Sequence, residues 1–216
     1  MTTSSPSDTT LPQGTRRRLL QLATLLPIAA MAKPALADAS DAQAFIAGLG
    51  DEVVAILTQP DASNEEKLVE LKTLLDDNTD LDLVARLVLG RHWRTASAAD
   101  RDEYVSLFRK ILTNTLAARL GDYEGQTFEV VGNNALSERD TAVQTQINRL
   151  GGAPPLRVDW RVRQHDGDYL IIDVVAEGVS LVVSQRNEVS SVVERQGMPG
   201  LIEAMRERSE EGGAVL

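Results

Sequence analysis

The sequence predicts an α+β fold in which a four-stranded antiparallel meander is wrapped by helices. Between Asp38 and Leu120, apolar residues recur at every third or fourth position, which is the period of an amphipathic helix. From Gln126 to Val175 the apolar period changes to two, and turns rich in Gly, Pro, Asn or Asp separate the segments. The helical period returns after Gly178. Helices, then consecutive strands, then helices again is the order of an α+β fold.

The bulk composition limits the function classes that the chain can serve. Its 216 residues suffice for one domain of ordinary size. A formal net charge of −10 argues against a nucleic-acid partner and against a polybasic membrane anchor. The absence of cysteine excludes disulfides, thiolate nucleophiles and cysteine-ligated metals.

The first residues have the three parts of a secretory signal. Arg16-Arg17-Arg18 precedes an apolar run from Leu19 to Ala32, and Ala35-Leu36-Ala37 fits a cleavage site. The run is too short to span a bilayer comfortably, although an uncleaved anchor is the alternative. Paired arginines followed by leucines resemble a twin-arginine signal. We therefore expect residues 1–37 to be a signal peptide, cleaved after Ala37, that exports the chain to the periplasm.

Local signals divide the first half of the expected mature chain into helices. Asp38–Thr58 is one helix, and a capping box beginning at Ser63 starts the next. Asp80–Leu120 reads as two further helices. Gly90 stops the first of them, and an S-x-x-D signal at Ser97 starts the second.

The second half begins with four predicted strands. They are Gln126–Val131, Thr141–Leu150, Leu156–Arg163 and Tyr169–Val175. We interpret Gly132-Asn133-Asn134 as a turn. The fourth strand is apolar throughout, which predicts burial on both faces. A helix ending at Gly197, a short helix from Met198 to Arg208 and a flexible tail at 210–216 complete the chain.

The chain offers little catalytic or metal-binding chemistry. His92 and His165 have no second histidine at helical spacing, so we expect no metal site. Nucleophile-elbow, P-loop and dinucleotide-binding motifs are absent from the sequence. Asp159, Asp173 and Glu177 lie on or near strands, where a buried pair could act as acid and base. Ion pairs with neighbouring arginines are the interpretation we favour, so we assign no catalytic residue.

Four segments carry a resemblance to a known family. They are LVLGRHWRTAS at 87–97, PLRVDWRV at 155–162, YLIIDVVAEGVSL at 169–181 and GMPGL at 197–201. In this order and spacing they resemble the MlaC family, also called the toluene-tolerance family, which is the periplasmic phospholipid-binding component of the Mla lipid-transport system. The similarity extends over most of Asp41 to Arg208.

The resemblance implies a lipid carrier rather than an enzyme. Residues 38–209 would form a single lipid-binding domain, with an apolar cavity between sheet and helices that holds phospholipid tails. The implied partners are the substrate-binding ring of an inner-membrane ABC transporter and an outer-membrane lipoprotein complex. Transfer between them maintains outer-membrane lipid asymmetry. We expect a monomer without a cofactor.

The apolar faces, read with the resemblance, assign ten residues to the lipid-binding cavity. They are Val84, Leu87, Val88, Tyr104, Phe108, Val158, Trp160, Ile172, Val174 and Val179.

Three alternatives stay open from the sequence. The ligand can be another apolar lipid, because the same lining would hold it. The domain can be a small isomerase or dehydratase, in which Asp173 would stand alone in an apolar cavity. It can also be a structural envelope module that binds another protein, in which case the core would be solid.

Overall fold

The computed structural model describes residues 37–211. Contacts divide the chain into Met1–Ala32 and Lys33–Leu216, and the described residues all belong to the second unit. The predicted signal peptide thus lies almost wholly outside the described residues, and its cleavage site stays a prediction. Between residues 37 and 211, no helix combines the length and the apolar character that a membrane crossing requires.

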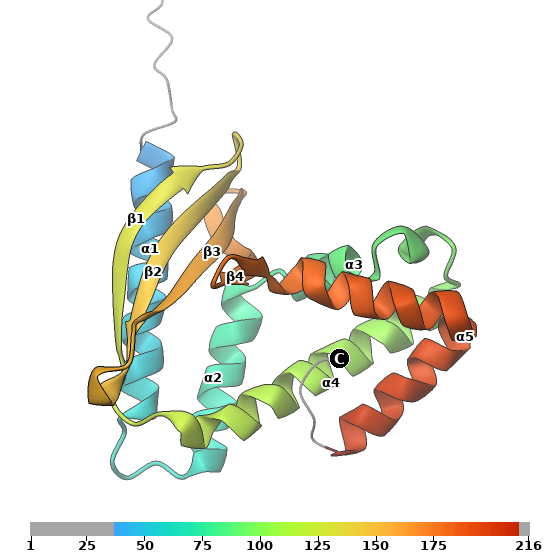
Figure 1. Ribbon diagram of the computed structural model, residues 1–216, viewed down its shortest axis with the longest axis horizontal. Helices are drawn as coiled ribbons and strands as arrows, with labels where there is room; N and C mark the ends of the chain where they lie inside the picture. Colours follow the sequence, from blue (N-terminus) through green and yellow to red (C-terminus); the bar gives the residue numbers. More distant parts are fainter. Residues whose placement is uncertain (1–36, 212–216) are drawn as a thin grey trace, which may run out of the picture. The chain divides into compact units, whose positions relative to one another are not determined.

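Helices precede and follow an antiparallel sheet, which confirms the α+β prediction (Figure 1). The described α-helices are α1 (Ala37–Leu57), α2 (Asn64–Asn78), α3 (Leu81–Leu89), α4 (Ala98–Arg119) and α5 (Leu181–Glu211). The described 3₁₀ helices are η2 (Gly90–Arg94), η3 (Leu120–Asp122) and η4 (Leu150–Gly152). The strands are β1 (Thr127–Ala135), β2 (Asp140–Asn148), β3 (Leu156–His165), β4 (Asp168–Ala176) and β5 (Val179–Ser180).

Capping boxes start α2 and α4 at the predicted serines. Ser63 Oγ accepts a hydrogen bond from Glu66 N at 3.2 Å, and the Glu66 carboxylate accepts from Ser63 N at 2.8 Å. The bonds from the Ser63 backbone and hydroxyl hold the pKa of Glu66 below its ordinary value. Ser97 and Asp100 repeat the arrangement at α4. Each box satisfies backbone N–H groups that the first helical turn leaves unpaired.

Gly90 ends α3 as predicted. Its φ of 58° and ψ of −127° lie in a region that side chains with a β-carbon rarely adopt. The chain then passes through η2, where two guanidinium groups lie close to the Trp93 ring. The Arg101 guanidinium carbon is 5.5 Å from the ring centroid, and that of Arg86 is 6.0 Å away. These cation–π contacts connect the break to the helices on either side of it.

The sheet is a meander in the order β1-β2-β3-β4-β5. The short fifth strand, which was not predicted, pairs with the end of β4. The predicted turn at Gly132-Asn133-Asn134 is wrong, because these residues continue β1 and pair with β2. A register shift between Val130 and Gly132 lets the strand continue past Val131. The turn comes later, where Ser137 Oγ accepts from Asp140 N at 3.0 Å.

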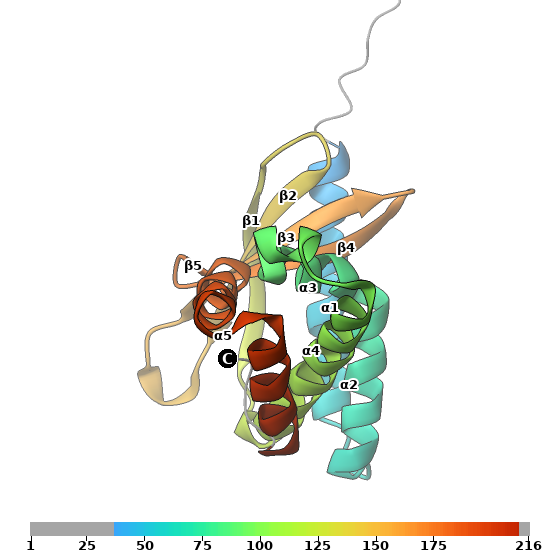
Figure 2. The ribbon, with the colours of Figure 1, turned by 90° about the vertical axis from the view of Figure 1, so that its right-hand side faces the viewer.

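The buried apolar residues form two separate clusters. The helical cluster joins α3, α4 and α5 (Figure 2). Its buried members are Ala85, Val88, Leu89, Tyr104, Phe108, Ile111, Val182, Val189, Leu201 and Met205. The sheet cluster joins α1 to one face of the sheet, and its buried members are Ala42, Ile46, Val143 and Val162. Figure 1 shows α1 running along the strands that it covers.

The C-terminal helix has a break at Gly197, as the sequence predicts. Its φ of 70° and ψ of −178° interrupt the helical backbone between two helical segments. Leu201 and Met205, after the break, return the chain to the helical cluster. The helix continues to Glu211, two residues into the predicted tail, and residues 212–216 lie outside the described range.

Candidate functional site

A cavity of about 690 Å³ lies between the sheet, α1, α2 and the end of α4. Its lining is almost entirely aliphatic and aromatic. The apolar lining residues are Ile46, Leu49, Gly50, Val53, Val54, Leu57, Leu71, Leu74, Leu75, Leu116, Leu120, Tyr123, Phe128, Ile147, Leu156, Trp160 and Ile171. This volume falls in the range of roughly 300–1,000 Å³ that is usual for small-molecule sites.

The sheet wall of the cavity exposes aromatic rings whose polar atoms are already bonded. Trp160 Nε1 donates to Thr145 Oγ1 at 3.0 Å, and that hydroxyl donates to the Val158 carbonyl at 2.6 Å. Thr145 is fully buried. The Phe128 ring meets the Trp160 ring edge-on, with centroids 6.5 Å apart. Because the indole N–H is satisfied inside the sheet, the wall needs no water or polar ligand.

The α1 wall comes close to the sheet at Gly50. A β-carbon at this position would lie only 2.4 Å from Phe128 Cδ1. A glycine in a helix weakens it, so the close approach is the physical reason to place one here. Gly48 lies two residues earlier in the same helix, and a β-carbon there would meet nothing within 4 Å. The two glycines of α1 therefore serve different purposes.

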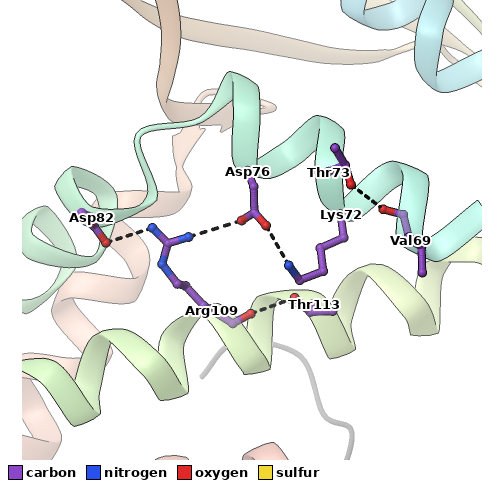
Figure 3. Close-up of polar contacts among 7 residues, drawn as sticks. All are labelled: Val69, Lys72, Thr73, Asp76, Asp82, Arg109 and Thr113. Carbon is purple, nitrogen blue, oxygen red and sulfur yellow. Dashed lines mark hydrogen bonds and ion pairs between the residues drawn. The ribbon is translucent and has the colours of Figure 1, made fainter.

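The α2 wall is tied to α3 and α4 by surface ion pairs (Figure 3). The Arg109 guanidinium of α4 lies 3.3 Å from Asp76 of α2 and 2.9 Å from Asp82 of α3. Lys72 pairs with the same Asp76 at 2.8 Å. All four side chains are substantially exposed, so each pair contributes at most about 1 kcal/mol. The inner face of α2, which includes the buried Leu71, lines the cavity.

The exposed polar lining residues gather at one end of the cavity, whereas Asn78 and Thr79 at the end of α2 are half-buried. Arg119, Asp122, Thr127 and Arg149 are exposed as well as cavity-lining, so they mark its mouth. They come from the end of α4, from η3, from the start of β1 and from the residue after β2. The cavity thus has an apolar interior and a polar, partly charged rim.

Five of the predicted lipid-binding residues lie in the helical cluster. Val88, Tyr104 and Phe108 are buried there, and Val84 and Leu87 pack against it. Burial raises the pKa of Tyr104, whose hydroxyl donates to the Ala85 carbonyl at 3.1 Å. None of these five residues is among those that line the cavity. Their contact with a ligand stays a prediction.

The other five predicted residues are on β3, β4 and β5. Trp160 lines the cavity. Val158 and Ile172 are buried, Val174 is half-buried, and Val179 is 57% exposed. The cavity therefore brings Trp160 together with residues that were not assigned to it, chiefly from α1 and α2. The helical period of apolar residues in these two helices could be recognised in the sequence. It did not show which of those residues would line a cavity and which would be buried in a core.

The carboxylates considered as catalytic candidates have structural partners. Asp173 accepts hydrogen bonds from Ser180 Oγ at 2.6 Å and from the Val182 backbone N–H at 3.1 Å, so it anchors the start of α5. It is not among the cavity-lining residues. Asp159 pairs with Arg157 at 3.1 Å, which confirms the ion-pair interpretation for that residue. In the described part of the chain, no group of three His, Cys, Asp or Glu side chains could hold a metal ion.

The family follows from comparison with known proteins. A model of the MlaC protein family matches residues 48–207, from within α1 to within α5. The chain belongs to the MlaC family. The match includes α2, the sheet and every residue that lines the cavity except Ile46.

A curated relative and a solved structure are similar to this chain. The intermembrane phospholipid transport system binding protein MlaC of Haemophilus influenzae is 22% identical over 130 residues, which are 59% of this chain and 61% of the relative. The chain therefore matches less than two thirds of that relative's length. The phospholipid-binding protein of Ralstonia solanacearum was solved in complex with a phospholipid. It superposes with a TM-score of 0.69 at 23% identity, over 79% of this chain and 98% of the other, which establishes a shared fold.

Proposed function

We propose that this chain is a periplasmic phospholipid-binding component of an intermembrane lipid-transport system. In this proposal the acyl chains of one phospholipid occupy the cavity between the sheet, α1 and α2, and the headgroup stays at the polar rim. The observation that carries the proposal is the cavity itself, which has about 690 Å³ of apolar space with charged residues at its mouth only.

The hydrophobic effect explains why such a carrier is useful. Two acyl chains hold on the order of 30 methylene groups, and at ~0.8 kcal/mol each their exposure to water costs on the order of 24 kcal/mol. Free diffusion of lipid between membranes is negligible at that cost. A cavity that matches the apolar interior of a bilayer makes exchange nearly neutral, so partner proteins can set its direction.

Membership of the MlaC family supports the proposal, and so does what the two similar proteins bind. The Haemophilus influenzae relative is the binding protein of an intermembrane phospholipid transport system, and the Ralstonia solanacearum protein holds a phospholipid. By this likeness we propose two partners, an inner-membrane ABC transporter with a substrate-binding ring and an outer-membrane lipoprotein complex. We propose that the chain acts as a monomer, without a cofactor and without catalysis.

The test is native mass spectrometry of the mature protein, purified without detergent, together with extraction of its lipids. We expect one phospholipid per chain. The matched variants lie on α2: Leu75→Glu places a carboxylate on a residue that lines the cavity, whereas Val69→Glu places it on a residue that is 65% exposed. An unpaired charge in an apolar cavity is strongly unfavourable, so the first variant should lose the lipid. The second should keep it.

Two results would contradict the proposal. One is wild-type protein that carries no lipid and takes up none from vesicles. The other is a Leu75→Glu protein that folds and carries as much lipid as the Val69→Glu control. Circular dichroism of both variants shows whether lost lipid reflects a lost fold.

Export by the twin-arginine route is a separate proposal, because residues 16–18 lie outside the described range. We propose that the arginines at 16–18 direct it. Replacing all three with lysine should stop periplasmic accumulation, measured by cell fractionation. Unchanged accumulation would indicate the general secretion route instead.

A further inference from the structure

The charged residues among the cavity lining are two arginines and one aspartate. They are Arg119, Arg149 and Asp122. The rim is therefore net positive, although the whole chain carries a formal charge of −10. This local excess of positive charge is placed where the headgroup of a lipid would emerge from the apolar interior.

The two arginines differ in how their charge is used. Arg119 forms an ion pair with Asp122 at 3.3 Å. Arg149 forms no ion pair within residues 37–211, and its guanidinium instead holds a backbone carbonyl. Its Nε and Nη2 donate to the Pro154 oxygen at 3.0 and 2.6 Å. A neutral carbonyl orients the guanidinium but leaves its positive charge uncompensated.

The connection between β2 and β3 holds Arg149 in this pose. Gly151 and Gly152 both have positive φ, 74° and 75°, and so fold the chain back toward the end of β2. A β-carbon at either position would be strained there. The loop therefore restricts the side chain before any ligand arrives, which reduces the entropy cost of a contact.

A neutral hydrogen-bond donor shares the rim. Thr127, which also lines the cavity, accepts a hydrogen bond from Asn148 Nδ2 at 3.3 Å. Its hydroxyl hydrogen has no acceptor among the described residues, so it can donate to a ligand. A cation and a hydroxyl beside an apolar cavity match a phosphate diester, which is anionic and accepts several hydrogen bonds.

We propose that Arg149 binds the phosphate of the lipid headgroup and makes the cavity prefer phospholipids over uncharged two-chain lipids. This inference rests on the proposed function. In it the aliphatic and aromatic lining supplies affinity for the tails, and Arg149 supplies the distinction between a phosphate-bearing lipid and diacylglycerol. The ligand chemistry is the lipid's own phosphodiester rather than free phosphate.

The experiment measures which lipid the protein takes from a mixture. The mature protein is incubated with vesicles that contain phosphatidylglycerol and diacylglycerol with the same acyl chains, separated from them, and its bound lipids are quantified by mass spectrometry. The ratio of the two bound lipids is compared between wild type and Arg149→Gln. Because both proteins meet the same vesicles, the lipids' own preference for the bilayer cancels.

We expect the ratio to fall by about fivefold in Arg149→Gln, which is the effect of an exposed but well-oriented ion pair. Arg139→Gln is the control, because Arg139 is exposed in the turn between β1 and β2 and does not line this cavity. Its ratio should equal that of wild type. Total lipid bound should stay similar in all three proteins, since the tails supply most of the affinity.

The outcomes separate this inference from the function on which it rests. Equal ratios in wild type and Arg149→Gln, with both lipids taken up, would overturn the role of Arg149 and leave the carrier function standing. Uptake of neither lipid by wild type would overturn the carrier function itself. Loss of the wild-type preference in millimolar inorganic phosphate would support the role of Arg149, because the free ion competes for the same guanidinium.

Discussion

The glycine pair of α1 gives the sharpest test of how the fold forms the cavity. Gly48 and Gly50 lie in the same helix, two residues apart, and differ in what surrounds them. A β-carbon at Gly48 would meet nothing within 4 Å, whereas one at Gly50 would lie 2.4 and 2.5 Å from two ring carbons of Phe128. Changing each to alanine therefore separates helix propensity from the close approach of α1 to β1.

The two substitutions should change the stability of the protein differently. Gly→Ala in a helix gains about 1 kcal/mol of stability, and Gly48→Ala should show that gain. At Gly50 the methyl group must push the Phe128 ring out to the ordinary carbon contact of about 3.5–4.0 Å, a shift of roughly 1–1.5 Å. Such overpacking costs about 1–3 kcal/mol, which cancels or exceeds the gain. The free energies of unfolding of the two variants should thus differ by about 2 kcal/mol.

The assay is urea unfolding of delipidated protein, followed by circular dichroism, with lipid uptake from vesicles measured in parallel. Phe128 lines the cavity, so its displaced ring should lower uptake in Gly50→Ala and leave it unchanged in Gly48→Ala. Equal stabilisation by both substitutions would refute the reasoning, since it would mean that the α1–β1 approach tolerates a methyl group without cost.

Three further predictions concern the helical cluster, a helix end and the sheet. Tyr104→Phe removes the bond to the Ala85 carbonyl without leaving a cavity, so urea unfolding should show a loss of about 0.5–1.5 kcal/mol. Gly90→Ala forces a β-carbon into a positive-φ backbone, and thermal unfolding should show a loss of about 1–3 kcal/mol. Hydrogen bonding to Arg163 holds the pKa of Asp140 below its ordinary value of about 3.9, so the charged carboxylate stabilises the fold above that pH. The free energy of unfolding should fall as the pH drops below about 4. The Asp140→Asn variant should be less stable than wild type at pH 7 but should lose less stability on acidification. Parallel curves of stability against pH for the two proteins would contradict this.

Local signals predicted most of the fold because each one acts within a few residues. Each capping box, at Ser63 and at Ser97, depends on hydrogen bonds within one helical turn, and the helix end at Gly90 depends on the backbone angles of one residue. Such features can be recognised in the sequence without knowledge of the tertiary structure. The error at Gly132-Asn133-Asn134 has the complementary cause. Glycine and asparagine favour turns locally, but pairing with β2 across a bulge decided their conformation. Pairing between strands is not a local property.

The position of the cavity could not be predicted from the sequence for the same reason. Periodicity identifies an apolar face, but not whether its partner face touches it. Tyr104 and Phe108 are apolar positions of a predicted helix, and they are buried in the helical cluster with α5. Leu74 and Leu75 of α2 read the same way, yet they face open space. Trp160 lines the cavity because its strand faces α1, and its contact with a lipid stays a prediction.

The division of α4 between two environments links the stable core to the candidate site. Its first turns bury Tyr104, Phe108 and Ile111 in the helical cluster, whereas Leu116 near its end lines the cavity. The cavity can therefore be empty or occupied while α4 remains fixed by the cluster. In the described chain, α2 has one buried residue, Leu71, and its polar ties to α1, α4 and the preceding loop are the hydrogen bond from Lys67 to the Leu57 carbonyl, the Arg109–Asp76 ion pair and the hydrogen bond from Gln59 to Glu70. Segments with few buried contacts open most readily. A lipid tail between α1 and α2 would supply α2 with the apolar contacts that the protein itself does not, so ligand binding should order this wall more than any other.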